Sequence, residues 1–473
     1  MSGQSRKARD GFRGCAELRG AMRVSRRRVL QAGTLGWLGL GLADYLARPA
    51  LAGESQRLIT PTAKRCIFIF MWGGPSHLDT FDLKPEAPAE VRGEFRPIAT
   101  NVAGIQICEH FKQLARHADK LAVIRSLNHS DPAHLSSGHA TLTGQWAPVR
   151  NSDAEPPSDR DNPHIGAVMA RLRPAEGALP SAVTMPWLAF HPAAPGGEAP
   201  GQHAGFLGKR YEPFLIKGDP NDAKFRIKAL ELPGTVTAQR LASRRELLGV
   251  IDRQRAALEQ AGESAAMNQF QQQAFSLLGS PAAREAFDIS AEPTKVRDRY
   301  GRNIHGQCVL LARRLVERGV PLVSINWHND GRNFWDTHGN NFNRLKNDLI
   351  PPADRALSAL LEDLDERGLL DETIVAWVGE FGRRPRITAG NAGREHWPWC
   401  YNGLLAGGGI RGGTLYGASD AQGMHPADLP VSPLDYAATL YHALGIRPEA
   451  TLPDSLNRPR HLCGGKPILP LFG

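Results

Sequence analysis

The fold of this 473-residue chain is constrained most by a series of short apolar segments that alternate with helical ones. Arg65–Met71, Pro321–Asn326 and Thr373–Val378 are almost uniformly apolar, which is typical of strands buried on both faces. Ala353–Arg367 places leucines at the spacing of an amphipathic helix and is followed by a glycine. This alternation predicts an α/β fold in which helices cover both faces of a mostly parallel central sheet.

The same signals predict further strands and helices along the chain. The strands are Leu121–Ser126 and Ser181–Met185, and the helices are Glu109–Lys120, His134–Thr143 and Gln307–Arg318. The polar, glutamine- and alanine-rich stretch at 237–290 predicts a helical insertion. The Pro/Gly-rich segment Pro192–Gly201 predicts a surface loop.

Histidine and carboxylate residues gather in loops that follow predicted strands. These loops are 73–82, 129–139, 328–341 and 380–398. Ligands of parallel sheets bind at the carboxyl ends of the strands, and zinc and manganese take imidazole nitrogen and carboxylate oxygen as ligands. We therefore predict a divalent-metal or anion site at this edge. A single His–Asp pair is more often explained by surface or hydrogen-bonding histidines, and it is the four loops at one edge that favour a site.

Residues 1–52 have the features of an export signal. Arg26 and Arg27 stand before a weakly apolar stretch at 32–47 that several glycines interrupt. That stretch leads to Ala50–Ala52, whose small-x-small pattern is typical of a signal-peptide cleavage site. Together these features indicate export by the twin-arginine route.

Cleavage of this leader is expected near Gly53, so the mature domain would span 53–473 in the periplasm or outside the cell. The mature chain is expected to have no transmembrane span. A membrane anchor is the alternative interpretation of the leader, and Asp44 and the glycines argue against it. Met22 is an alternative start codon, because the segment that precedes Arg23 is long for a signal peptide.

The formal net charge of +9 belongs mainly to the leader, which holds ten of the 57 Lys and Arg and three of the 48 Asp and Glu. The remaining chain is nearly neutral and has no basic–aromatic stripe, so we expect no nucleic-acid partner. The cysteines after the leader are Cys66, Cys108, Cys308, Cys400 and Cys463. Their odd number and lack of Cys-x-x-Cys spacing indicate neither a disulfide framework nor a thiolate zinc site.

Several longer motifs together resemble a known family. They are GGPSHLDTFD, HLSSGHATLTG, WDTHGNNF, LDETIVAWVGEFGR, REHWP and VSPLDYAATLYHALGI. They resemble an exported twin-arginine family catalogued as a domain of unknown function, itself similar to the sulfatase and alkaline phosphatase superfamily. The resemblance extends from about Cys66 to Ile446. It implies an alkaline phosphatase-like three-layer sandwich, a divalent metal (zinc, manganese or calcium) and an exported cytochrome-like partner.

The resemblance also shows where this chain departs from the superfamily. His134 stands at the position of the Ser, Thr or Cys nucleophile, so ordinary sulfatase chemistry is not expected. A histidine at a helix N-terminus is expected to be neutral and able to bind a metal. Trp72 occupies the position of the first metal-binding carboxylate, which Asp79 or Asp82 could replace from deeper in the loop.

Other positions of the superfamily site are partly retained. The late Asp-His pair aligns with Glu380 and Phe381, so the carboxylate is kept and the imidazole is lost. A later single histidine matches His396. Asp336 and His338 resemble the Asp…His pair of the other metal, which implies that one of two metal sites is retained.

The resulting assignments name ten residues. They are His134 and Glu380 as catalytic groups, Asp336, His338, His396 and Asp79 as metal ligands, and Arg383, Arg394, His139 and His77 as anion or substrate contacts. They fit a metal-dependent hydrolase that acts on small-molecule or glycan esters of phosphate, sulfate or related acids. A non-catalytic sugar- or anion-binding protein and an accessory subunit of an exported complex are the alternatives.

Replacing both leader arginines, as Arg26→Lys with Arg27→Lys, should leave the protein in the cytoplasm with its leader attached. The paired arginines are the feature that defines this export signal. Fractionation followed by a size measurement on immunoblots distinguishes the precursor from the mature chain. Normal processing of the double variant would exclude the twin-arginine route.

Overall fold

A sheet of eight strands forms the centre of the computed structural model, in the order β12–β4–β11–β8–β1–β7–β5–β6. The strands are β1 (Arg65–Met71), β4 (Leu121–Leu127), β5 (Ala182–Met185), β6 (Phe214–Leu215), β7 (Leu322–Trp327), β8 (Thr373–Val378), β11 (Tyr401–Ala406) and β12 (Thr414–Tyr416). Every pairing is parallel except those of β11, which runs antiparallel to β4 and β8. The predicted, mostly parallel sheet is confirmed.

The structure describes residues 61–227, 230, 239–240, 243, 276–327 and 335–473. The predicted leader, most of the predicted insertion at 237–290 and part of the predicted loop at 328–341 lie outside these residues. The last part of the insertion contains the short helix α9 (Pro281–Phe287), which Ser280 caps. Within the described ranges, no helix is both long and apolar enough to span a membrane.

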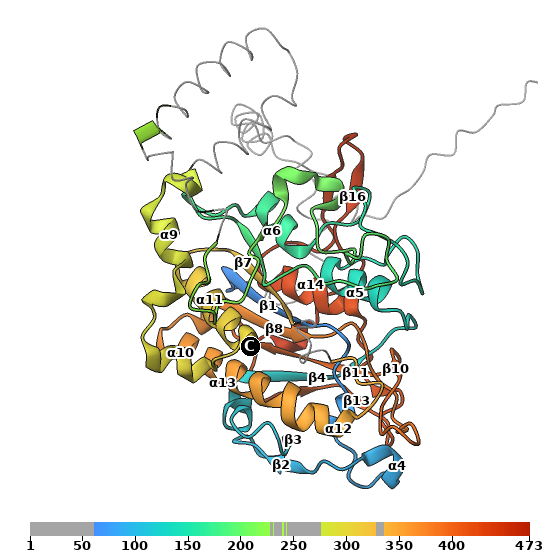
Figure 1. Cartoon of the computed structure of the whole chain (residues 1–473). Coiled ribbons are helices and arrows are strands. Elements are labelled where there is room, and N and C mark those ends of the chain that lie inside the picture. The colour runs from blue at the N-terminus through green and yellow to red at the C-terminus, as the bar shows by residue number, and fades with distance from the viewer. Residues whose placement is uncertain (1–60, 228–229, 231–238, 241–242, 244–275, 328–334) are drawn as a thin grey trace, which may run out of the picture. The chain divides into compact units, whose positions relative to one another are not determined.

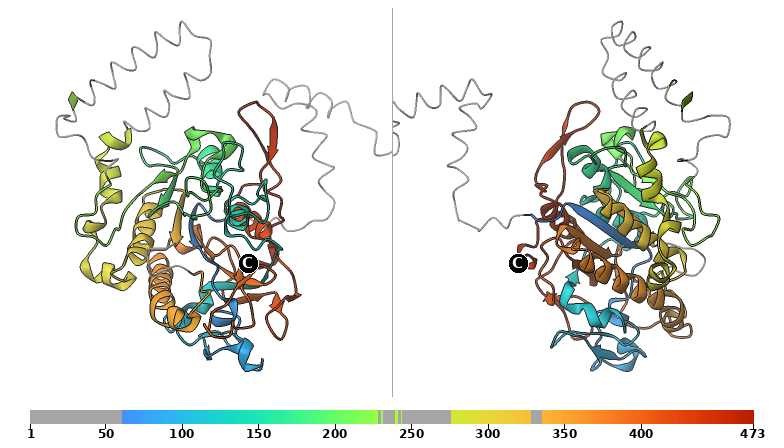
Figure 2. Two further views of the ribbon diagram at one scale, coloured as in Figure 1. Left: turned by 45° about the vertical axis from the view of Figure 1, so that its right-hand side comes forward. Right: turned by 90° about the vertical axis from the view of Figure 1, so that its left-hand side faces the viewer.

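Helices cover both faces of the sheet, as Figures 1 and 2 show. One layer contains α9, α10 (Thr294–Tyr300), α11 (Ile304–Glu317) and α13 (Ile350–Glu366), and the other contains α5 (His134–Thr143), α6 (Ile165–Leu172) and α14 (Pro433–Ala443). In β1, Ile67 and Ile69 belong to the first core and Phe68 and Phe70 to the second. The described part of the chain is therefore a three-layer α/β sandwich with a large apolar core on each face of the sheet.

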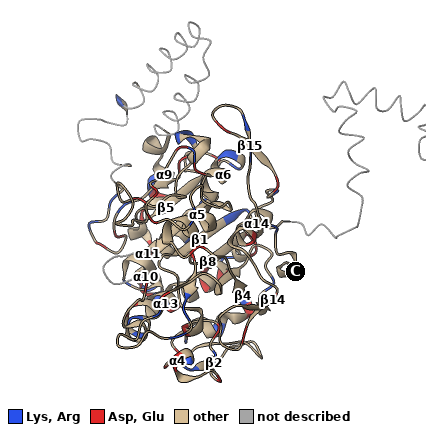
Figure 3. Cartoon of the chain, turned by 90° about the vertical axis from the view of Figure 1, so that its right-hand side faces the viewer, with Lys and Arg blue, Asp and Glu red and all other residues tan. Residues whose placement is uncertain are grey.

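Besides several short 3₁₀ and π segments, the described fold contains smaller α-helices and strands. They are α4 (Ala89–Arg92), α12 (Asn341–Arg344), β2 (Pro97–Ala99), β3 (Gln106–Cys108), β9 (Gly382–Arg383), β10 (His396–Trp397), β13 (Ala418–Ser419), β14 (Pro426–Asp428), β15 (Thr451–Pro453) and β16 (Pro459–His461). These strands form four separate two-stranded sheets. Figure 3 shows basic and acidic residues intermixed over the described elements.

The predicted helix Glu109–Lys120 is wrong for its first half. Only the 3₁₀ segment Leu114–Lys120 is helical, and it is kinked at His117. The backbone N–H groups of Gln113 and Leu114 donate to the Asp354 carboxylate on α13, at 2.7–3.1 Å. A partner from another helix therefore replaces the intrahelical bonds that a regular α-helix would need here.

The strands that carry the predicted site all end at one edge of the sheet. β1, β7 and β8 are parallel, and β4 has the same direction because β11 is antiparallel to both β4 and β8. The loops after β1 and β7 touch closely at this edge. Gly73 has a φ of +103°, and a Cβ there would lie 2.3 Å from the Asp336 backbone nitrogen. Glycine is therefore required for the two loops to meet.

We expect Gly73→Ala to destabilise the protein more than Gly104→Ala does. Both glycines have positive φ, but a Cβ at Gly104 would meet nothing within 4 Å. In each variant the unfavourable backbone conformation should lower the free energy of unfolding by about 1–2 kcal/mol. Gly73→Ala should lose a further 1–3 kcal/mol or so from overlap with the facing backbone. Urea unfolding measures both losses, and equal values would contradict this close approach.

Candidate metal site

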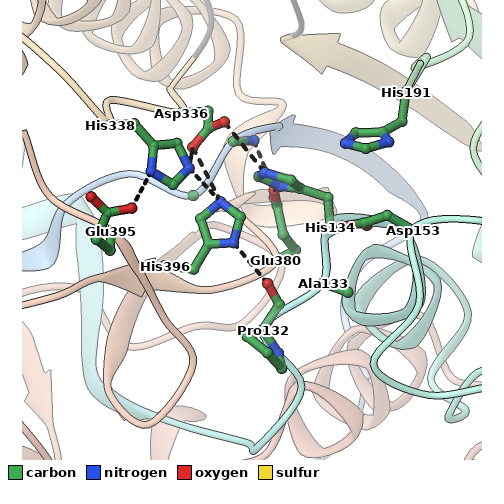
Figure 4. Close-up of polar contacts among 12 residues, drawn as sticks. Pro132, Ala133, His134, Asp153, His191, Asp336, His338, Glu380, Glu395 and His396 are labelled. Atoms are coloured by element: carbon green, nitrogen blue, oxygen red, sulfur yellow. Dashed lines mark hydrogen bonds and ion pairs between the residues drawn. The ribbon is translucent and has the colours of Figure 1, made fainter. Parts of the chain in front are cut away.

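His134 lies between two carboxylates at the carboxyl edge of the sheet (Figure 4). It is the first residue of α5 and follows Ala133, whose backbone is extended. Its Nδ1 lies 2.5 Å from Glu380 Oε1, and its Nε2 lies 3.5 Å from Asp336 Oδ2. Glu380 also accepts a hydrogen bond from the Gly73 N–H at 2.8 Å. The His134 ring is therefore held from both sides.

The two carboxylates determine the charge of His134. Burial disfavours its charged form, but the hydrogen bonds to Asp336 and Glu380 outweigh burial and raise the pKa of His134 to about 9. The expectation of a neutral imidazole is thus wrong for this arrangement. Direct contact with two anions has a larger effect than the positive end of a helix dipole.

Asp336 is the centre of the cluster. Its carboxylate contacts the Arg383 guanidinium, and its Oδ1 lies 3.0 Å from His338 Nε2 and 3.3 Å from His396 Nε2. Burial alone would raise the pKa of Asp336, but Arg383 and the imidazoles, His134 included, hold it well below its usual range. Asp336 is therefore an anion that faces several nitrogen donors at once.

The two remaining histidines have their outer nitrogens fixed by oxygen acceptors. His396 Nδ1 lies 2.8 Å from the Pro132 carbonyl and donates to it, so the lone pair of a neutral ring is on Nε2. That nitrogen can accept from His338 Nε2, which lies 2.9 Å away. His338 Nδ1 contacts the Glu395 carboxylate. An oxygen acceptor behind each imidazole is the arrangement that orients histidine ligands of metals.

These histidines differ in their pKa. The hydrogen bond to Asp336 raises the pKa of His338. Burial lowers the pKa of His396, although Asp336 opposes that effect. The His396 imidazole is therefore the one most readily available in the neutral form that binds a metal.

The cluster fits a divalent transition metal. The ligand atoms of His134, Asp336 and His396 all lie within 4.8 Å of one another. In the overlapping trio of Asp336, His338 and His396, the Nε2 atoms of the two histidines are 2.9 Å apart. A tetrahedral zinc ion with bonds of about 2.0–2.1 Å separates its ligand atoms by about 3.3–3.4 Å. Mixed nitrogen and oxygen donors suit zinc or manganese better than calcium, which takes oxygen.

Asp79 and Arg394 lie apart from this cluster and are paired with each other. Arg394 Nε donates to Asp79 Oδ2 at 2.8 Å, and both side chains are completely buried. Arg383 is also completely buried, with its guanidinium bonded to Asp336 and to the carbonyls of Gly73 and Gly74. As folded here, Asp79 does not reach the cluster, and neither arginine is exposed to an anionic ligand.

The two other predicted contact residues are also buried outside the cluster. His77 Nε2 lies 2.7 Å from the Gly423 carbonyl. His139 Nδ1 lies 3.2 Å from the Gln145 carbonyl, and burial lowers the pKa of His139 to about 4. His139 lines a pocket with Ser136, Ala147, Pro148, Val149, Ser152, Glu155, Pro156, Ser158, Arg160, Asp161 and Pro200.

Sequence reasoning did not assign Glu395 or His191. Glu395 directly precedes the candidate ligand His396, and this position beside a candidate ligand could have identified Glu395 from the sequence. His191 directly precedes the predicted loop Pro192–Gly201, and its ring centroid lies 5.8 Å from that of His134. No motif marks His191 in the sequence.

Phe381 and the α5 serines limit the chemistry of the cluster. The buried Phe381 ring lies with its centroid 4.5 Å from that of His396, and it offers no ligand atom. The Ser136 hydroxyl donates to Asp131, and the Ser137 hydroxyl contacts the Ala133 carbonyl. Neither serine presents a free nucleophile to the cluster.

Arg383→Gln should destabilise the protein strongly, because it leaves the mostly buried Asp336 carboxylate, whose side chain is 16% exposed, without its guanidinium partner. Loss of one partner from a buried ion pair costs about 3–5 kcal/mol. Arg386→Gln is the matched control, since Arg386 is exposed nearby in the chain. Urea unfolding should show that the control's free energy of unfolding stays within about 0.5 kcal/mol of the parent's. A similar small change for Arg383→Gln would contradict the central role of the Arg383–Asp336 pair.

Comparison with known proteins assigns the chain to a family. The fold resembles a sulfatase from Pseudoalteromonas sp. at 13% identity and a TM-score of 0.36, over 81% of this chain and 68% of the other. It also resembles a phosphonate monoester hydrolase from Silicibacter pomeroyi at 14% identity and a TM-score of 0.33, over 87% and 76%. These values assign no activity to this chain, and no curated protein matches it. The family model described as "Protein of unknown function (DUF1501)" matches residues 63–472, so the chain belongs to that family.

Proposed function

We propose that this chain is an exported, divalent-metal-dependent hydrolase of phosphate, sulfate or related esters. One observation carries the proposal: the Asp336 carboxylate is surrounded by three imidazoles at the edge of the sheet where α/β proteins bind ligands. Each imidazole has an oxygen acceptor behind it, as metal ligands do. Three imidazoles that converge on one carboxylate, with His134 buried and the other two partly exposed, mark a candidate functional site.

Asp336, His338 and His396 would hold the metal. When bound, the metal would polarise the ester and lower the pKa of a water molecule. Arg383 fixes the Asp336 carboxylate, and Glu395 orients His338. These contacts would keep the ligand atoms in place before the metal arrives, which favours tight binding.

His134 is assigned the catalytic role, with Glu380 as the group that orients it. A histidine backed by a buried carboxylate can hold and transfer a proton, and His134 is the cluster residue paired in this way. Since the α5 hydroxyls are bonded elsewhere, we propose that water is the nucleophile, which releases its proton to solvent. The charged His134 imidazole would donate its proton to the leaving oxygen of the ester. The pocket lined by His139 and Ser136 would receive the organic part of a small-molecule or glycan ester.

Metal analysis of the purified mature protein tests the proposal, together with hydrolysis of p-nitrophenyl phosphate and p-nitrophenyl sulfate. The parent should contain about one equivalent of zinc or manganese. Loss of a residue that only supports a ligand weakens metal binding about 10–100-fold. His396→Ala removes a ligand itself, so it should weaken metal binding at least as much. His461→Ala is the control, because His461 is exposed and outside the cluster.

His134→Ala should retain the metal while hydrolysis falls, because it removes the proton donor and leaves Asp336, His338 and His396 in place. A parent that binds no metal and hydrolyses neither ester would overturn the proposal. A non-catalytic sugar- or anion-binding protein would then be the better interpretation. Normal hydrolysis by His134→Ala would remove the catalytic role from that residue.

A further inference from the structure

The proposed ligands come from two loops that are distant in the sequence. Asp336 and His338 follow β7, whereas His396 begins β10 and Glu395 directly precedes that strand. A metal site of this kind works only if the two loops keep a fixed separation, because ligand positions must be held within about 0.5 Å. The cluster itself provides one such link, the contact between Arg383 and Asp336.

A second link lies outside the cluster, at Asp79. Its carboxylate is completely buried and contacts both loops. Asp79 Oδ2 accepts from Asn341 Nδ2 at 2.9 Å and from Arg394 Nε at 2.8 Å, and Oδ1 accepts from Arg394 Nη2 at 3.1 Å. Ser76, in the same loop as Asp79, donates to Oδ2 at 2.6 Å.

The residues that Asp79 holds are next to the ligands in the chain. Thr337 stands between Asp336 and His338, and its hydroxyl donates to Asn341 Oδ1 at 2.6 Å. The Thr337 carbonyl in turn accepts from the Arg394 backbone N–H at 3.0 Å. Arg394 immediately precedes Glu395 and His396. A movement of either loop would therefore break a bond within this network.

The two loops are also in tight backbone contact. A Cβ on Gly393 would lie 1.8 Å from the His338 carbonyl oxygen. Arg394 further donates to the Val91 carbonyl at 2.8 Å, and Arg383 Nη1 donates to the Arg394 carbonyl at 3.2 Å. Close packing transmits a displacement of Arg394 directly to the His338 segment, since protein interiors have little free space.

We infer that Asp79 and Arg394 are positioning residues, which fix the separation of the Asp336–His338 and Glu395–His396 segments and thereby set the affinity of the metal site. We call this pair and its bond to Asn341 the Asp79 brace. The inference rests on the proposed function for its reference to a metal. Asp79 and Arg394 thus share one positioning role. The sequence had predicted a metal ligand at Asp79 and an anion contact at Arg394.

Asp79→Asn tests the brace, with Glu292→Gln as a matched control. Glu292 is another buried carboxylate paired with arginines, Arg313 at 2.8 Å and Arg314 at 2.5 Å, and it contacts no cluster residue. Both variants should lose stability. Only Asp79→Asn should weaken zinc binding, about 10–100-fold in competition with a chromophoric chelator. Unchanged zinc affinity in folded Asp79→Asn, or an equal loss in Glu292→Gln, would overturn the inference.

Arg394→Lys provides a milder variant if Asp79→Asn does not fold. It keeps the positive charge but loses the two-pronged contact with the carboxylate, so zinc affinity should fall by a smaller factor. If Arg394→Lys and any folded Asp79 variant bind zinc as tightly as the parent does, the positioning role is excluded.

Crystal structures of the zinc-free parent and variants separate this inference from the proposed function. The distance between His338 Nε2 and His396 Nε2, 2.9 Å in the parent, should increase in Asp79→Asn and stay unchanged in Glu292→Gln. If the parent binds no zinc, the proposed function fails, while this distance still tests the brace. An unchanged distance in Asp79→Asn overturns the brace whether or not zinc binds.

Discussion

The negative charge of Asp336, largely removed from water, is the constraint on which the rest of the site depends. A buried carboxylate is stable only when positive or hydrogen-bonding groups compensate it. Arg383, His134, His338 and His396 supply that compensation from different loops. Satisfying one charge thus brings together side chains that are far apart in the sequence. The same requirement explains why the surrounding loops are packed without space for a Cβ at Gly73.

The main architecture could be predicted from the sequence because buried parallel strands leave an unambiguous pattern. Uniformly apolar runs located β1, β7 and β8 almost to the residue. β11 was not predicted, because Tyr401–Ala406 includes asparagine and glycine and has a weaker strand signal. The failure of the helix at Glu109–Lys120 has a different cause, since Asp354 on α13 decides where those backbone N–H groups bond. A contact of that kind leaves no local trace in the sequence.

The residues that form the site could be predicted from the sequence. Which charged side chains pair with one another could not. The rule that ligands lie at the carboxyl ends of parallel strands was sufficient to bring His134, Asp336, His338, Glu380 and His396 together. Sequence alone could not separate arginines that face a ligand from arginines that neutralise a buried acid. That distinction depends on burial and on partners from distant loops. Roles of charged residues are therefore the least predictable part of such a site.

The direction of β11 has a consequence for how the site is connected. Gly403 of β11 pairs with Val378 at the end of β8, so the antiparallel strand starts at the edge where β8 finishes. The segment 379–400 consequently leaves and returns to the same edge, with no crossover to the opposite end of the sheet. A parallel strand in this place would need a return helix. The reversed strand instead leaves a long stretch of chain free to build the loop that carries Glu380, Glu395 and His396 and is anchored at both ends.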